Sequence, residues 1–211
     1  MIEVGAGFAS HSLTLSKYVK KYVENDLPAN LKIKREIEDK FIGDLPVKFV
    51  AGDIFDEKTW VELGKQLVEG PVAIFCEGLI MYLSEEQQTQ LLGRVGKLLR
   101  EKGGFFMHKD PNKYHQEIEF DKELNNQRFS KLRSMLIGVS GNKSLEELYT
   151  QEEITKFYER LGFDVERRPE VAEGDSLIID QFSEDNKAGA TADLKVMEKA
   201  GYRTWILRLR K

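Results

Sequence analysis

The chain has 211 residues, with 32 Lys and Arg against 36 Asp and Glu, and its formal net charge is −4 at pH 7. This balance, without a basic stripe interleaved with aromatic residues, disfavours nucleic acid as a direct partner. The length suits one domain, so we expect residues 1–211 to share a single core.

The single cysteine, Cys76, lies in an apolar run, so we expect a buried thiol and no disulfide framework. No apolar run approaches the roughly 20 residues that span a bilayer, and the chain opens on a strand rather than on a basic and apolar leader. These features favour a cytoplasmic protein that does not enter a membrane.

The chain begins with a short apolar strand that runs into a glycine turn, Glu3-Val4-Gly5-Ala6-Gly7. Gly5 suits a backbone angle closed to other residues, and Gly7 removes a side chain that would keep a ligand from the main chain. Ser10 stands where the dinucleotide fingerprint has its third glycine, so the pattern leans away from NAD. Glu3 favours a ligand with a cationic amino group, such as S-adenosylmethionine, over one with phosphates. The alternative is a purely structural turn.

A short helix over residues 9–17 and a second strand over residues 20–24 follow. Asp26 lies about 20 residues beyond the glycine turn, where an exposed acid past the strand end accepts hydrogen bonds from ribose hydroxyls. Glu24 is the competing acid, but strand alternation would point it along the face of the sheet. Asp26 as a turn-former that bonds its own backbone is the structural alternative.

A helix is predicted over residues 31–40, followed by a third strand over residues 47–51. Asp53, just past this strand, is placed to accept a hydrogen bond from an exocyclic amine such as adenine N6, with Ile54 packing on the ring. Asp53 as the cap of a helix that begins near Lys58 is an equal alternative.

The uninterrupted apolar run Val72–Cys76 indicates a central parallel strand that is covered on both faces. Glu77 follows at once, and a carboxylate there is costly unless it meets a cation, so we expect Glu77 and Gly78 to face the ligand. Ser84 then opens a long helix through about residue 102.

The remainder predicts a fifth strand over residues 105–108, a sixth over 163–168 and a last strand over 203–209, with helices over 150–160 and 191–200. The charged residues 112–149 are predicted to form a lid insertion or, alternatively, a solvated helical hairpin. Together these elements predict an α/β fold: a Rossmann-like, doubly wound, mostly parallel seven-stranded sheet with an antiparallel last strand.

Three segments, Glu3–Gly7, Tyr22–Pro28 and Glu77–Leu83, together resemble the leucine carboxyl methyltransferase family and its bacterial polyketide O-methyltransferase relatives. The resemblance covers the chain through its last strand, loosely after Pro111. It implies an S-adenosylmethionine-dependent O-methyltransferase that acts on a small molecule.

The resemblance also implies roles for individual residues. The glycine loop with Gly5, Ala6 and Gly7 would hold the methionine portion of the cofactor, and Asp26 would hold the ribose. Asp53 and Ile54 would hold adenine. The segment from Glu77 to Leu83, which includes Gly78 and Tyr82, would close over the sulfonium end.

Members of this family carry a helical segment before the first strand, whereas this chain starts inside that strand. We therefore expect a fragment, a misassigned start or a chain that has lost turnover. An apolar surface near Phe8, Met81 and Tyr82 would then be uncovered and would favour a homodimer.

A carboxylate acceptor is ionised at neutral pH and needs no general base, whereas a hydroxyl acceptor needs one. His108, at the outer end of the fifth strand, and His115 are the candidate imidazoles, although a lone His in such a place is usually structural. We expect Tyr82 and His108 to contact the substrate, an acceptor that is a carboxylate or an acidic hydroxyl, and we expect no metal. The alternatives are a non-catalytic binding domain of the same fold and, more weakly, a nicotinamide-dependent reductase.

Overall fold

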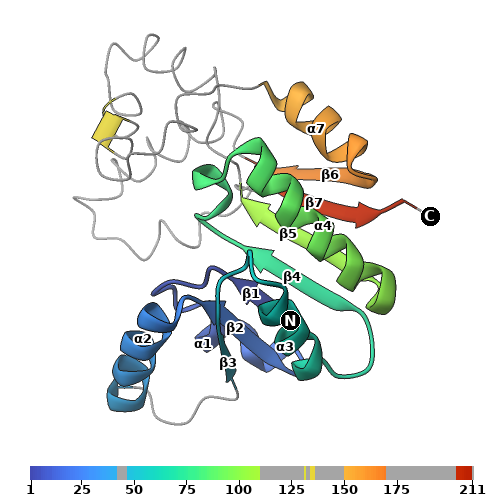
Figure 1. Ribbon diagram of the computed structural model, residues 1–211. Coiled ribbons are helices and arrows are strands. Elements are labelled where there is room, and N and C mark those ends of the chain that lie inside the picture. Colours follow the sequence, from blue (N-terminus) through green and yellow to red (C-terminus); the bar gives the residue numbers. More distant parts are fainter. Residues whose placement is uncertain (42–46, 110–130, 132–133, 136–149, 170–202, 211) are drawn as a thin grey trace, which may run out of the picture.

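The computed structural model describes residues 1–41, 47–109, 131, 134–135, 150–169 and 203–210. They form a seven-stranded sheet with the strand order β3-β2-β1-β4-β5-β7-β6 (Figure 1). The strands are β1 (Ile2–Val4), β2 (Tyr22–Asp26), β3 (Val47–Ala51), β4 (Val72–Cys76), β5 (Gly104–Lys109), β6 (Phe163–Pro169) and β7 (Arg203–Leu209).

The first five strands are parallel to one another, and β7 runs antiparallel between β5 and β6. The predicted fold class, including the antiparallel last strand, is therefore confirmed.

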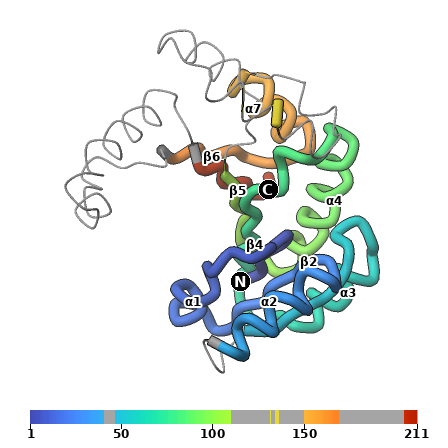
Figure 2. Tube along the Cα trace, turned by 90° about the vertical axis from the view of Figure 1, so that its left-hand side faces the viewer, coloured from blue at the N-terminus to red at the C-terminus, as the bar shows by residue number. Residues whose placement is uncertain are grey.

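Helices cover both faces of the sheet, with α1 on one side and α3 and α4 on the other (Figure 2). The described helices are α1 (His11–Leu15), η1 (Ser16–Tyr18), α2 (Pro28–Phe41), α3 (Glu57–Gln66), η2 (Ile80–Tyr82), α4 (Glu85–Lys102) and α7 (Gln151–Arg160). Among the described helices, none is both long enough and apolar enough to cross a membrane.

Local sequence signals explain where the longer helices begin. Ser84 caps α4 through a capping box with Gln87, and Thr150 caps α7 through the same arrangement with Glu153. Each box satisfies backbone N–H groups that the first helical turn leaves without partners. Both boundaries agree with the sequence prediction.

The second strand begins and ends two residues later than predicted. Its pairing with β1 places Ile2 beside Val23, and its pairing with β3 continues to Asp26 beside Ala51. All five residues of β2 are buried, including the three polar ones. Tertiary pairing on both sides therefore outweighs the turn propensity of the Asn25-Asp26 pair.

The core lies on both faces of β1 and β4, where Ile2, Val4 and Ile74 are fully buried. The predicted inward stripe of α4 packs there through Leu91, Leu92, Val95, Leu98 and Leu99. The predicted lid, apart from residues 131 and 134–135, and the predicted helix over residues 191–200 lie outside the described residues.

Candidate functional site

The order of the strands locates a candidate site. Strands β2 and β3 are added to the sheet on one side of β1, whereas β4 and β5 are added on its other side. The order of the strands therefore reverses between β1 and β4. In open parallel sheets ligands bind at such a switch point, outside the carboxyl ends of the strands. The glycine loop after β1 and the segment after β4 lie at this edge.

The two glycines of the loop differ in their surroundings. Both have a positive backbone angle, φ 66° for Gly5 and φ 49° for Gly7. A methyl group on Gly5 would lie 2.8 Å from Leu79 Cδ2, so Gly5 lets the segment after β4 pack against the loop. A methyl group on Gly7 would meet nothing within 4 Å. Gly7 is thus where a ligand has room to approach the main chain.

Ala6, between them, is structural. Its side chain is buried, and its N–H donates to the carbonyl of Asn25 at 3.0 Å. This bond fixes the loop to the end of β2 and leaves the face at Gly7 for a ligand.

Asp26 is the last residue of β2, and it is buried rather than exposed past the strand end, which corrects the sequence prediction. Its Oδ2 accepts from the N–H of Gly7 at 2.7 Å, and its Oδ1 accepts from the N–H of Leu27 and from Asn30 Nδ2, each at 2.7 Å. Since a carboxylate has about four acceptor positions, one remains. Asp26 therefore holds the glycine loop in place and retains capacity for a hydroxyl donor.

Glu24, the competing acid, is fully buried, and its Oε2 lies 2.5 Å from Lys34 Nζ of α2. Lys34 is also buried. This ion pair joins α2 to the face of the sheet, and it leaves Glu24 inaccessible to a ligand at the strand ends. The structure thus favours Asp26 over Glu24 as the acid at the site.

Asp53 is exposed after β3, and its Oδ1 accepts from the N–H of Phe55 at 2.8 Å. The cap of α3 is Asp56, whose side chain accepts from Lys58 N–H, so the alternative role of Asp53 as that cap is wrong. Ile54 belongs to the buried core and is 7% exposed, which leaves little of it to pack on a ring.

Four charged or titratable side chains form a connected chain, the Glu3–Lys109 relay, across the switch point. His11 Nδ1 and Glu3 Oε1 are joined by a 2.8 Å hydrogen bond, and His11 Nε2 lies 2.9 Å from Glu77 Oε2. The other oxygen of Glu77 lies 2.7 Å from Lys109 Nζ.

Glu3 is buried at the inner end of this relay, which corrects its predicted direct contact with a ligand. Its second oxygen accepts from the hydroxyl of Tyr22 at 2.5 Å. Burial, and then the hydrogen bond to Glu3, raise the pKa of Tyr22. Glu77 lies between His11 and Lys109 and is partly exposed, so it is the carboxylate of the relay that a ligand can reach.

His11 was not predicted as a site residue. Its position in the first turn of α1, directly after the glycine loop, is the signal that would have drawn attention to it. Its ring also meets Phe75 edge-on, with the centroids 5.2 Å apart.

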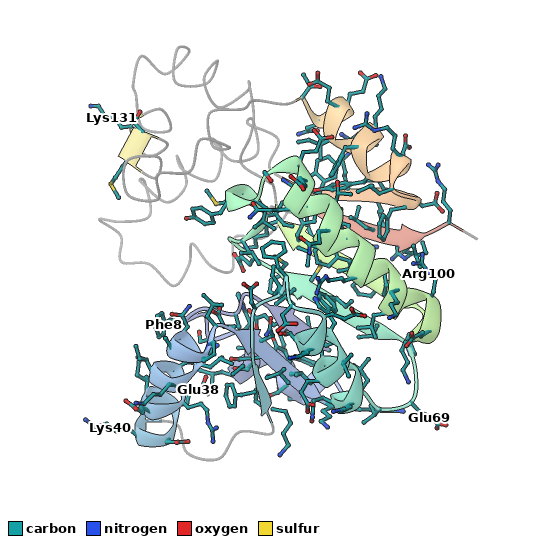
Figure 3. The ribbon with its side chains drawn as sticks, viewed as in Figure 1. Phe8, Glu38, Lys40, Glu69, Arg100 and Lys131 are labelled. Atoms are coloured by element: carbon teal, nitrogen blue, oxygen red, sulfur yellow. The ribbon has the colours of Figure 1, made fainter. Side chains whose placement is uncertain are left out.

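The segment after Glu77 turns at Gly78, whose φ is 69°, into the short helix η2. Tyr82 and Met81 are half-buried there, while Phe8 is 60% exposed at the surface (Figure 3). Dimer formation through this region stays a prediction.

His108 does not lie where a substrate would contact it. It is fully buried, its ring stacks on Trp205 with the centroids 6.2 Å apart, and Tyr158 packs edge-on at 5.5 Å. Burial lowers the pKa of His108 to about 4, so it is neutral at physiological pH. The predicted substrate contact is therefore wrong for this conformation, because β7 and α7 cover the ring.

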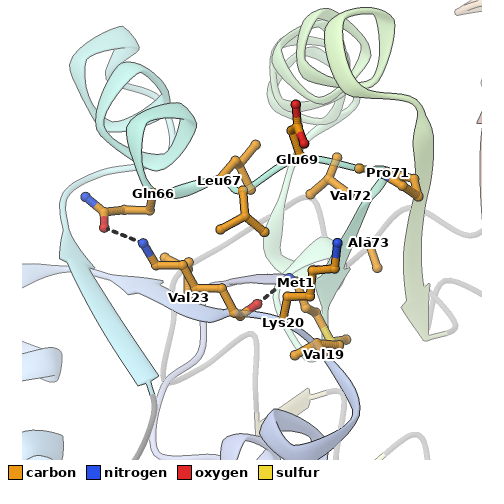
Figure 4. Close-up of a pocket in the computed structure, with 13 residues that line it drawn as sticks. Met1, Val19, Lys20, Val23, Gln66, Leu67, Glu69, Pro71, Val72 and Ala73 are labelled. Atoms are coloured by element: carbon orange, nitrogen blue, oxygen red, sulfur yellow. Dashed lines mark hydrogen bonds between the residues drawn. The ribbon is translucent and has the colours of Figure 1, made fainter.

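One pocket, with a volume of about 240 Å³, lies at the opposite edge of the sheet (Figure 4). It is lined at the amino ends of the strands by Met1, Lys21 and Val72, among others. Lys21 Nζ donates to Gln66 Oε1 there at 3.3 Å. This is the edge away from the switch point, so the pocket is separate from the candidate site. Among the described residues, no group of three or more His, Cys, Asp and Glu side chains could hold a metal ion.

The family model for leucine carboxyl methyltransferase matches residues 2–96. No curated protein sequence matches the chain significantly.

Solved structures share the fold. LepI in complex with SAM is 10% identical, with a TM-score of 0.58, and the match covers 99% of this chain and 42% of LepI. An O-methyltransferase family protein from Burkholderia thailandensis is 14% identical, with a TM-score of 0.59, over 100% of this chain and 50% of that protein. Magnesium protoporphyrin IX methyltransferase (ChlM) from Synechocystis PCC 6803 with bound SAH is 11% identical, with a TM-score of 0.55, over 100% of this chain and 73% of ChlM.

At such identities the likeness concerns the fold, and this chain spans half or less of the first two structures. Residues 2–96, which the family model for leucine carboxyl methyltransferase matches, contain the glycine loop, Asp26 and Glu77.

Proposed function

We propose that the chain is an S-adenosylmethionine-dependent O-methyltransferase domain that acts on a carboxylate or an acidic hydroxyl of a small molecule. The observation that carries the proposal is the arrangement at the switch point, where the N–H of Gly7 is held by Asp26 beside open space. The family match over residues 2–96 covers the same residues.

The side chains at this edge fit the parts of that cofactor. Asp26 keeps one acceptor position for a ribose hydroxyl, and the exposed Asp53 is available to accept from the adenine amine. Glu77 offers a partly exposed carboxylate for the cationic amino group. Gly7 lets the ligand lie against main chain. When bound, the cofactor supplies a methyl group that its sulfonium has already activated.

The chain's own task is then to align an acceptor and to exclude water. Both ring nitrogens of His11 lie against carboxylates, and His108 is buried in the core, so neither of these two imidazoles is placed to remove a proton from an acceptor. The other candidate, His115, lies outside the described residues. The placement of His11 and His108 supports an acceptor that is already ionised at neutral pH, as a carboxylate is. The identity of the acceptor beyond that class is left to the assay.

The test is transfer of a labelled methyl group from S-adenosylmethionine to a panel of small carboxylic acids and acidic phenols. A Gly7→Val variant serves as the control, because its side chain would fill the space at the loop and force a left-handed backbone on a branched residue. We expect product with wild type and none with the variant. Cofactor binding without transfer to any acceptor would instead indicate a non-catalytic binding domain, and the absence of both would refute the proposal.

A further inference from the structure

The Glu3–Lys109 relay joins four segments that are distant in the sequence. Glu3 comes from β1, His11 from α1, Glu77 from the segment after β4 and Lys109 from the end of β5. Glu3 is 2% exposed, His11 and Glu77 in the middle of the relay are 31% and 29% exposed, and Lys109 is 47% exposed. The relay therefore has a dry, fixed inner end and an outer end at the surface.

The imidazole lies between two carboxylates, which accept hydrogen bonds and cannot donate them when they are ionised. Its Nδ1 is hydrogen-bonded to Glu3 at 2.8 Å, and its Nε2 lies 2.9 Å from Oε2 of Glu77. Only the imidazolium form carries a proton on both nitrogens. Glu3 is anchored on its other side, because it is buried and its second oxygen accepts from the hydroxyl of Tyr22. The ring of His11 is in turn fixed from the side by Phe75. Glu77 is thus tied through His11 to the core.

We propose that His11 is a positioning residue that holds the Glu77 carboxylate at the switch point, ready to receive the ammonium of an amino-acid ligand end. This inference rests on the proposed function. Without the imidazole, the space left by the ring would separate two negative charges, Glu77 and Glu3, which repel each other. Glu77 would keep only its ion pair with Lys109 and would move with that side chain towards solvent. A Glu77 side chain that is free in solvent loses rotamer freedom when a ligand binds, and this loss of entropy weakens the binding.

The role predicts which part of the cofactor depends on His11. S-adenosylhomocysteine carries an amino-acid end with an ammonium group, whereas 5′-methylthioadenosine has the same adenine, ribose and thioether without that end. Loss of His11 should weaken binding of the first compound and spare the second. A merely structural role would weaken both alike.

The experiment is calorimetric titration of both compounds into wild type, His11→Phe and His11→Arg. Phe keeps a ring against Phe75 and removes both donors, while Arg restores donors to both carboxylates. Thr14→Ala is the matched control on the exposed face of α1, where the Thr14 hydroxyl donates to the backbone carbonyl of His11 at 3.1 Å. This substitution keeps the imidazole of His11. Thermal unfolding of each variant verifies that the fold is retained.

We expect His11→Phe to weaken S-adenosylhomocysteine binding about tenfold or more, the scale of a lost charge-assisted contact, with 5′-methylthioadenosine unchanged. His11→Arg should restore most of the loss, and Thr14→Ala should bind as wild type does. Unchanged or tighter S-adenosylhomocysteine binding by His11→Phe, or an equal loss for both compounds, would overturn the role of His11 alone. A wild-type chain that binds neither compound would overturn the proposed function and this inference with it.

Discussion

Replacement of Asp26 by Asn tests how the glycine loop is held. Both oxygens of Asp26 face donors: the N–H of Gly7 on one side, and the N–H of Leu27 with the amide of Asn30 on the other. An Asn side chain has one acceptor and one donor end. Whichever way it is oriented, its NH₂ group must face another donor.

The cost follows from the burial of the site. Asp26 is 8% exposed, so a donor that loses its acceptor is largely cut off from water. An unsatisfied buried group costs about 1–3 kcal/mol, and the surviving bonds lose their charge assistance, so we expect Asp26→Asn to lower the free energy of unfolding by about 2–4 kcal/mol. We also expect weaker binding of S-adenosylhomocysteine, because the loop at Gly7 is no longer fixed.

Urea unfolding followed by circular dichroism measures the first effect, with Asp53→Asn as the matched control. Asp53 also lies near the carboxyl end of a parallel strand, two residues past β3, and accepts a backbone N–H. It is exposed, however, and an amide oxygen can replace its carboxylate oxygen. Its substitution should change the free energy of unfolding by less than about 0.5 kcal/mol. Equal stability of the two variants would refute the reasoning that Asp26 is a buried tie between loop and helix.

Three further predictions concern buried groups. Lys34→Met should destabilise the fold by about 3–5 kcal/mol by leaving the Glu24 charge unpaired, and adding Glu24→Leu should recover most of the loss in the same urea assay. Burial lowers the pKa of His108 from 6.5 to about 4, so the unfolded chain binds a proton more readily than the folded chain does. The free energy of unfolding should therefore be constant above about pH 6.5 and fall by up to about 3 kcal/mol as the pH is lowered to 4. His108→Phe should abolish this pH dependence. Burial raises the pKa of the Cys76 thiol to about 12, so the thiol should be alkylated at pH 8 only when the chain unfolds. Rapid alkylation of the native chain would contradict the burial of Cys76.

Much of the fold could be predicted because local signals suffice for it. The strands Val47–Ala51, Val72–Cys76 and Arg203–Leu209 match their predicted bounds. Each is an apolar or alternating run, and Gly-Pro pairs, Gly residues or polar turns mark its end. The capping boxes at Ser84 and Thr150 fixed two helix starts in the same way. In contrast, the bounds of β2 depend on its two neighbours, which no local pattern reveals.

The site was harder to predict, because its side chains meet partners that are far away in the sequence. Asp26 was recognised at the right place, but its hydrogen bond from the N–H of Gly7, 19 residues earlier in the chain, was not predicted. His11 contacts Glu77, which lies on another segment of the chain. Neither contact has a signature in sequence spacing, since each requires the order of the strands.

His108 is a case where a signal was present. Phe106 and His108 lie two residues apart on β5 and so share a face, and Phe106 is fully buried. That alternation alone indicates a core position for His108. The cover itself comes from Trp205 on β7, about 100 residues later in the chain.

Calorimetric titration of the wild-type chain with S-adenosylhomocysteine and, separately, with NADH tests the central claim most directly. The open main chain at Gly7, the acid Asp26 and the reachable carboxylate of Glu77 suit an adenosyl amino acid, whereas a carboxylate near the loop repels a pyrophosphate. We predict one site for S-adenosylhomocysteine and no heat of binding for NADH. Binding of NADH, or of neither compound, would contradict the assignment of this edge of the sheet to S-adenosylmethionine.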